Sequence, residues 1–327
     1  MSLRMNEGMS GSLFDSNEPP PLAARLRPML RAWADRGVYF GTSSWKYEGW
    51  LGSIYTPERY ETRRKLSRQK FESECLREYA ETFPTVGGDF SFYQFPKAEF
   101  WVSLFAQVPQ SFTFGLKVPE GVTVLRWPGH ARYGARAGSA NEHFLDGALF
   151  EQAFLRPLEP HRHQVATVMF EFGTFSKSEF PSVGEFLPRL ERFLASLPPG
   201  FPYAVEIRNK EYLTPAYFAA LARLNVAHVF NAWTRMPTLA EQIAIPDAFT
   251  ADFTVVRALL QHGRGYENAV KLFEPYKEVQ EPNEATRLAL REIAERTVKT
   301  KRRVYAFVNN RVEGNAPGTI AAVAENP

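Results

Sequence analysis

Eight short segments with the composition of β-strands recur along the chain, and segments with helical periodicity separate seven of them from the next. This alternation is typical of a parallel sheet covered by helices. Eight units over roughly 290 residues match a (β/α)8 TIM barrel that contains insertions. A doubly wound open sheet is the alternative. It would need a glycine-rich first turn, whereas Gly41-Thr42-Ser43 does not match G-x-G-x-x-G. We therefore predict an α/β protein with the TIM-barrel fold.

The predicted boundaries follow from turn residues and from the period of the apolar positions. We expect strands at residues 38–41, 85–90, 112–117, 165–170, 203–207, 228–231, 253–258 and 304–308. We expect helices at residues 21–37, 61–82, 97–107, 183–195, 215–224, 239–243, 266–273, 284–299 and 319–324.

One domain accommodates most of the chain. Residues 1–37 are predicted to form an extension, flexible up to about residue 20 because of its Ser, Gly, Asn and Pro content, followed by a leading helix. Residues 38–327 would form the barrel. An insertion at 119–164 follows the third strand and is expected to contain a helix near 142–155. It should cover the mouth of the barrel as a lid or side wall, with its residues Trp127, His130, Arg132 and Tyr133 facing the pocket.

The fifth predicted strand places charges and apolar side chains on opposite faces. Val205 and Ile207 alternate with Glu206 and Arg208. In a barrel, the apolar pair would face the outer helices and the charged pair would face the axis or the mouth. An isolated strand of this kind would instead expose its charges to water.

Polar residues also end the other predicted strands: Asp89, Lys117, Glu171, Asn231, Arg257, Asn309 and Asn310. The carboxyl ends of barrel strands form the active-site face of TIM barrels, so this pattern predicts a polar pocket there. The alternative is a solvated rim with internal salt bridges. Aromatic residues in the adjoining loops, including Trp45 and Tyr93, could provide a surface for stacking.

Five motifs resemble domain-of-unknown-function family 72, the YecE-like proteins. They are GTSSWKYEGWLGSIY at 41–55, SFYQFP at 91–96, FTFGLKVP at 112–119, YAVEIRNKEYL at 203–213 and YAFVNNRVEGNAPGT at 305–319. The resemblance covers about residues 38–322 and implies a TIM barrel, without supplying a reaction. It points to Trp45, Phe92, Tyr93, Lys117, Glu206, Arg208, Asn309 and Asn310, and Arg257 also fits.

The chain departs from the family pattern at several positions. Gly87 and Asp89 stand where the family usually has Glu and Asn, Val124 follows Thr123 in place of His, and Arg311 follows the Asn pair in place of His. The fourth strand ends in Glu171-Phe172-Gly173 where a Gln-Pro-like turn is usual. The resemblance therefore implies a diverged branch.

Proton transfer is the chemistry that the polar strand ends favour. Glu206 and Lys117 are the candidate acid and base, with Asp89 beside them, and we expect Lys117 and Glu206 to form an ion pair with Arg208 nearer the rim. A structural ion pair that fills the barrel is the alternative. The predicted substrate-binding residues are Trp45, Tyr93, Arg208, Asn231, Arg257, Asn309 and Asn310.

The sequence is compatible with two further kinds of site. An anion could bind beside the last two strands, at Arg257, His262, Arg264 and the loop 314–318. Asp89, Glu171, Glu206 and His228 could approach a metal ion, but no H-x-x-x-H or C-x-x-C spacing supports this, and we expect neither metal nor cofactor.

Three functions fit the predicted pocket. The first is an enzyme that catalyses hydrolysis, isomerisation or an elimination reaction of a small anionic or carbohydrate-like substrate. The second is a noncatalytic protein that binds such a ligand. A metal-dependent nucleic-acid-processing barrel is third, and the net charge of only +3 makes a nucleic-acid partner unexpected. A single cysteine, no signal peptide and no membrane-spanning run lead us to expect a cytoplasmic protein. The sequence leaves the oligomeric state open.

Overall fold

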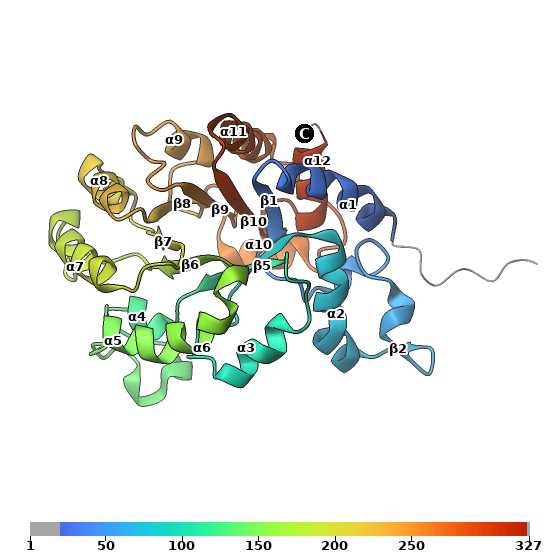
Figure 1. Cartoon of the computed structure of the whole chain (residues 1–327), viewed down its shortest axis with the longest axis horizontal. Helices are drawn as coiled ribbons and strands as arrows, with labels where there is room; N and C mark the ends of the chain where they lie inside the picture. The colour runs from blue at the N-terminus through green and yellow to red at the C-terminus, as the bar shows by residue number, and fades with distance from the viewer. Residues whose placement is uncertain (1–19, 326–327) are drawn as a thin grey trace, which may run out of the picture.

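A closed barrel of eight parallel strands forms the centre of the molecule, as the alternation predicts (Figure 1). The computed structural model describes residues 20–325, so the expected flexible segment before residue 20 lies outside the described residues. The barrel strands are β1 (Val38–Thr42), β4 (Thr85–Gly88), β5 (Thr113–Lys117), β6 (Val165–Glu171), β7 (Tyr203–Glu206), β8 (Ala227–Ala232), β9 (Phe253–Ala258) and β10 (Arg303–Val308). Each strand pairs with its neighbours in sequence order, and β10 and β4 both pair with β1 to close the barrel.

Helices surround the barrel. They are α1 (Pro21–Ala34), α2 (Arg68–Thr82), α3 (Ala98–Phe105), α7 (Val183–Ser196), α8 (Pro215–Arg223), α9 (Leu239–Ile243), α10 (Tyr266–Phe273), α11 (Glu284–Thr300) and α12 (Ala316–Ala324). Short helical turns join several of them: η1 (Glu48–Trp50), η2 (Pro57–Tyr60), η6 (Lys210–Tyr212) and η7 (Asn310–Val312). None of the helices between residues 20 and 325 is long and apolar enough to cross a membrane.

The predicted helix at 61–82 is wrong over its first turns. Residues 61–66 form a small antiparallel hairpin, β2 (Glu61–Thr62) and β3 (Lys65–Leu66). Arg63 and Arg64 take positive φ values of 54° and 62°, which a right-handed helix excludes. The helix α2 begins only after Ser67, whose side chain accepts a hydrogen bond from the backbone N–H of Lys70.

The segment at 119–164 is a chain of short helical pieces beside β5 and β6. They are α4 (Glu120–Thr123), η3 (Ala131–Arg136), α5 (Gly147–Phe150), the π-helical turn η4 (Glu151–Leu155), α6 (Arg156–Leu158) and η5 (Glu159–Gln164). The helix expected near 142–155 begins at Gly147, because the carboxylate of Asp146 caps it by accepting from the N–H of Leu149.

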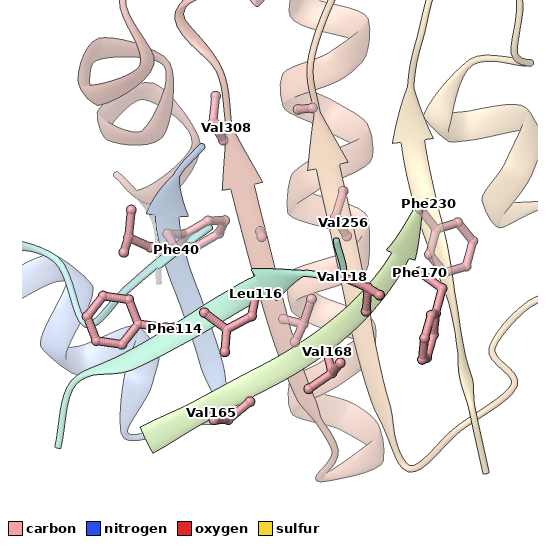
Figure 2. Close-up of a cluster of buried hydrophobic side chains, with 14 of the residues drawn as sticks. Phe40, Phe114, Leu116, Val118, Val165, Val168, Phe170, Phe230, Val256 and Val308 are labelled. Atoms are coloured by element: carbon pink, nitrogen blue, oxygen red, sulfur yellow. The ribbon is translucent and has the colours of Figure 1, made fainter. Parts of the chain in front are cut away.

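Two apolar cores lie on the two sides of the barrel wall. The outer core fills the space between strands and helices, and Figure 2 shows part of it, including Phe114 and Leu116 of β5 with Val168 and Phe170 of β6. The inner core lies inside the barrel and includes Ala204, Val255 and Phe307. Val205 and Ile207 belong to the outer core, so the predicted parity of β7 is confirmed.

The first and last described helices, α1 and α12, contact each other. The indole N–H of Trp33 in α1 donates to the carbonyl of Ala324 in α12 across 3.1 Å, and the two helices lie side by side at the blue and red ends of the ribbon (Figure 1).

Candidate functional site

A network of six charged side chains fills the carboxyl-terminal mouth of the barrel. The Nζ atom of Lys117, the last residue of β5, lies 3.0 Å from Glu171 Oε2 and 3.2 Å from Asp89 Oδ1. The ring of Phe92 covers the same ammonium group, 3.7 Å from its centroid. The loops after β4 and the ends of β5 and β6 therefore place these groups together.

Two arginines complete the network. Arg257 Nη1 donates to Glu171 Oε2 at 2.5 Å and to Glu206 Oε2, and Arg257 Nη2 lies 3.7 Å from Asp89 Oδ1. Arg208 Nη2 lies 2.9 Å from Glu171 Oε1 and 3.2 Å from Glu206 Oε1. The ring of Trp233 stacks on the Arg208 guanidinium at 3.9 Å.

The predicted ion pair between Lys117 and Glu206 is wrong. Both side chains point into the barrel as expected, but Lys117 pairs with Glu171 and Asp89, whereas Glu206 pairs with Arg257 and Arg208. The reason is strand order. β6 lies between β5 and β7, and its terminal carboxylate is closer to Lys117 than the carboxylate of the strand beyond it.

The charges in the network balance, with three cations and three carboxylates. Burial alone would raise the pKa of Glu171, but the charges of Arg208, Lys117 and Arg257 outweigh it and hold this pKa far below its usual range. Burial would likewise lower the pKa of Arg257, and the charges of Glu206, Glu171 and Asp89 raise it instead. Glu171 therefore remains ionised at neutral pH and is unsuited to act as a general acid.

Exposure separates the members of the network. The side chain of Glu206 is 0% exposed and that of Lys117 is 6% exposed, whereas Asp89 is 56% exposed. Asp89 also lines a cavity of about 670 Å³ beside the mouth, so it connects the buried charges with that cavity.

The cavity lies between the loops after β1 and β4 and the helices α2 and α3. Three predicted binding residues, Trp45, Tyr93 and Asn309, line it with Asp89. The other lining residues are Ser43, Ser44, Lys46, Tyr47, Glu72, Ser73, Gly88, Phe90, Phe100, Ser103, Leu104, Gln107, Tyr266 and Arg311. Its walls thus combine aromatic rings with hydroxyl, amide and charged groups.

Two predicted binding residues have internal partners away from this cavity. The side-chain amide of Asn231 donates to the carbonyl of Ile207 at 3.2 Å, and its Oδ1 atom is buried without a partner in the described part of the chain. Asn310 Oδ1 accepts from the backbone N–H of Ala316 at 2.8 Å, where α12 begins. Neither residue lines the cavity.

The expected anion site at the loop 314–318 is occupied by the chain's own side chains. Asn315 Oδ1 accepts from Gly318 N–H at 2.7 Å, and Glu313 binds Arg287 and Thr319. Arg264 pairs with Glu281 at 2.6 Å. These contacts leave Arg257 in the charged network and Arg311 in the cavity as the cations of this region that face the mouth.

His228 lies outside the barrel interior among Tyr217, Phe218 and Phe230, so it does not approach the carboxylates of the mouth. Within residues 20–325, no group of three or more His, Cys, Asp or Glu side chains is arranged to hold a metal ion.

The insertion touches the edge of the cavity without lining it. Arg132 stacks on Tyr93 at 4.4 Å, and the Tyr133 hydroxyl donates to Glu120 Oε2 at 2.7 Å. Trp127 packs on Tyr133, and His130 is exposed. The segment therefore contacts the side of the cavity through Arg132 and Tyr93. The prediction of a lid or side wall is wrong in one respect, because none of the four residues expected to face the pocket lines the cavity.

Residues 39–326 match the family described as "Protein of unknown function DUF72". The chain belongs to the DUF72 family. It is 28% identical over 186 residues to the UPF0759 protein YunF of Bacillus subtilis (strain 168), an alignment that covers 55% of this chain and 54% of YunF. The chain thus spans about half the length of the curated relative it matches.

Solved structures of DUF72 proteins share the fold. A DUF72 family protein from Thermotoga maritima MSB8 superimposes with a TM-score of 0.57 at 21% identity, covering 88% of this chain and 96% of that protein. A DUF72 family protein from Enterococcus faecalis V583 gives 0.56 at 16% identity, with the same coverage. These similarities support the barrel and say nothing further about the site.

Two glycines of the barrel strands, Gly87 and Gly115, lie against the ring of Phe307. A Cβ atom on Gly87 would lie 2.9 Å from Cγ of Phe307, and one on Gly115 would lie 2.4 Å from its Cζ. A larger side chain at either glycine would therefore meet the Phe307 ring. Glu171 joins Lys117 to both arginines, and Arg311 lines the cavity, but neither is among the catalytic or substrate-binding residues predicted from the sequence. A comparison of strand ends around the barrel could have assigned Glu171 to the site.

Proposed function

We propose that this DUF72 protein is an enzyme that transfers a proton on a small carbohydrate-like substrate carrying an anionic group. The position of Asp89 supports this most directly. Asp89 is the one member of the charged network that is both more than half exposed and part of the cavity wall. Its carboxylate lies 3.2 Å from the Lys117 ammonium, which is buried and does not itself line the cavity.

The proposal gives the network two tasks. Asp89 accepts a proton from the substrate, and the buried Lys117 ammonium holds the Asp89 carboxylate in position. Glu171, Glu206 and the two arginines hold Lys117 and Asp89 in place and do not reach the cavity. Their buried, paired charges need no rearrangement during the reaction, which is how preorganised sites lower barriers.

The cavity wall favours a polar substrate with an apolar face. Trp45 and Tyr93 offer aromatic surface, while Ser43, Ser44 and Asn309 offer hydrogen bonds. Arg311 stacks on Tyr266 at 4.4 Å and, among the described residues, has no carboxylate within 4.0 Å. Its buried Nε atom also has no hydrogen-bond partner there. A carboxylate or phosphate group of the substrate would supply that partner.

The test uses a panel of sugar acids, sugar phosphates and neutral sugars. The melting temperature of the protein with each compound measures binding, and NMR of each compound in D2O measures proton exchange. Stabilisation and exchange of a carbon-bound proton for deuterium are expected with at least one anionic sugar. Asp89→Asn should abolish exchange and retain binding. Glu72→Gln, which removes a carboxylate from the same cavity outside the network, is the matched control and should retain exchange, whatever its effect on substrate binding. Exchange that survives in Asp89→Asn would refute the assignment.

The three cations and three carboxylates of the network neutralise one another, and this favours one alternative, a noncatalytic protein that binds the same class of ligand. Every cation of the network already has a carboxylate partner, so the network can be complete without a substrate. Stabilisation by an anionic sugar without exchange or product formation would support this alternative over the enzyme.

A further inference from the structure

A second hollow, of about 760 Å³, lies at the opposite end of the barrel from the mouth. The loops that enter β6, β7, β8, β9 and β10 form its rim, and three inner-core residues, Ala166, Phe253 and Tyr305, form part of its floor. This end of a TIM barrel is usually devoted to stability, so a distinct chemical character here needs an explanation.

The rim is strongly basic. Arg162, Lys301, Arg302 and Arg303 line it, against one carboxylate, Asp252. The whole chain has 39 Lys and Arg against 36 Asp and Glu, whereas the hollow has four Lys and Arg against one Asp. Within residues 20–325, no carboxylate lies within 4.0 Å of the basic groups of Lys301, Arg302 or Arg303.

Uncharged groups act on two of these cations. Arg302 Nη1 donates to the carbonyl of Ala251 at 3.1 Å, and the Tyr305 hydroxyl raises the pKa of Arg303. Arg162 differs, because its Nη1 lies 3.3 Å from Glu159 Oε1, and Gly200 makes room for it, since a Cβ atom there would lie 2.7 Å from that Nη1. The guanidinium groups are therefore positioned and still have donors available for an anion.

Lys301 occupies a backbone conformation that usually selects glycine. It ends α11 in the left-handed region, with φ 53° and ψ 33°. Glycine is the common residue at this point of a helix end because it has no Cβ to strain. A lysine here places an exposed ammonium group on the rim, although its Cβ is strained at this positive φ. The backbone conformation is therefore an independent indication that the positive charge has a role at the hollow.

We propose that this basic hollow binds a small molecule with two or more phosphate groups. Paired N–H donors of arginine match phosphate oxygens, and a volume of this size is within the range of small-molecule sites, about 300–1,000 Å³. A concave site suits a compact polyanion better than a nucleic-acid duplex, which needs an extended basic stripe. The proposal is independent of the function of the mouth.

Calorimetric titration of the full chain with inorganic pyrophosphate at low ionic strength tests the site. Lys301→Gly removes one cation and relieves the left-handed residue, so it should weaken binding at least tenfold while the melting temperature stays the same or rises. Arg303→Gln should weaken binding similarly. Lys299→Ala, which removes an exposed cation from the same helix end outside the hollow, is the matched control and should leave affinity unchanged.

Three results would overturn the proposal. They are no pyrophosphate binding to the wild-type chain, equal weakening in Lys299→Ala and Lys301→Gly, or binding of duplex DNA in the same assay without binding of pyrophosphate. The second would indicate attraction by general surface charge, and the third an extended nucleic-acid surface.

Discussion

Glu206 has no exposed surface and faces two arginines, so its charge is stabilised only by its partners. Glu206→Gln keeps the shape of the side chain and leaves the buried network with an uncompensated positive charge. Breaking a buried pair in this way costs about 3–5 kcal/mol, and we expect a loss at the lower end because Glu171 still contacts both arginines. Urea unfolding of the variant at neutral pH measures this loss.

The control for Glu206 is Glu72→Gln, in which an exposed carboxylate is removed and a change below about 1 kcal/mol is expected. An unchanged or larger free energy of unfolding in Glu206→Gln would contradict a stabilising pair. It would indicate instead that this carboxylate is retained for function at the expense of stability.

His228 predicts how acid affects the fold. Burial lowers the pKa of His228 to about 3, well below the ordinary value near 6.5 that it would have in the unfolded chain. The unfolded state therefore binds a proton that the folded state excludes as the pH falls below about 6.5. The stabilisation is complete above this pH and is lost progressively toward pH 3. His228→Leu should reduce the fall in unfolding free energy between pH 7 and pH 5.

The range from pH 7 to pH 5 distinguishes the effect of His228 from that of the carboxylates, because carboxylates in the unfolded chain have pKa values near 4. His161, whose pKa burial also lowers, remains in both proteins and accounts for part of the slope that is left. Equal slopes for wild type and His228→Leu between pH 7 and pH 5 would contradict a neutral, buried imidazole.

Inside the barrel, the ring of Phe307 in β10 lies against Gly87 of β4 and Gly115 of β5. A Cβ atom on Gly115 would lie 2.4 Å from Phe307 Cζ, so Gly115→Ala should lower the free energy of unfolding by about 1–3 kcal/mol through overpacking. In a Phe307→Leu background the same change should cost less, because the far end of the ring is gone. A double-mutant cycle measured by urea unfolding gives the coupling between the two positions.

Gly129→Ala is the matched control, since nothing lies within 4 Å of its added methyl group. It should be close to neutral. Additive effects of Gly115→Ala and Phe307→Leu would show that the ring does not limit this layer of the barrel.

The sequence predicted the strands and the faces of their side chains, but not the partners of the charges. A period of two places Lys117 and Glu206 on the face opposite the apolar side chains of their strands, and closure of the barrel makes that face the inner one. Which carboxylate reaches Lys117 depends on strand order and stagger around the closed barrel, which no single strand encodes. The helix at 61–82 was misplaced for a similar reason. Arg63 and Arg64 are good helix formers, and their positive φ values follow from the hairpin that they connect.

At the scale of the molecule, the chain closes twice, once through β1 and β10 and again outside the barrel through α1 and α12. The second closure covers the first, because the buried face of α12 includes Ile320, Ala321 and Val323, which join the outer core. A chain that ends after Asn315 should therefore lack the native fold and bind an apolar dye.

Trp33→Phe tests the same closure more gently. It removes the hydrogen bond to the Ala324 carbonyl and leaves that carbonyl buried, at a cost of about 1–3 kcal/mol. Because α1 and α12 share the outer core with the barrel, helix content and tyrosine environment should change together in a single transition, at lower urea than in wild type. Two separate transitions would mean that the barrel folds without the contact between α1 and α12. That contact would then stabilise only its own part of the molecule.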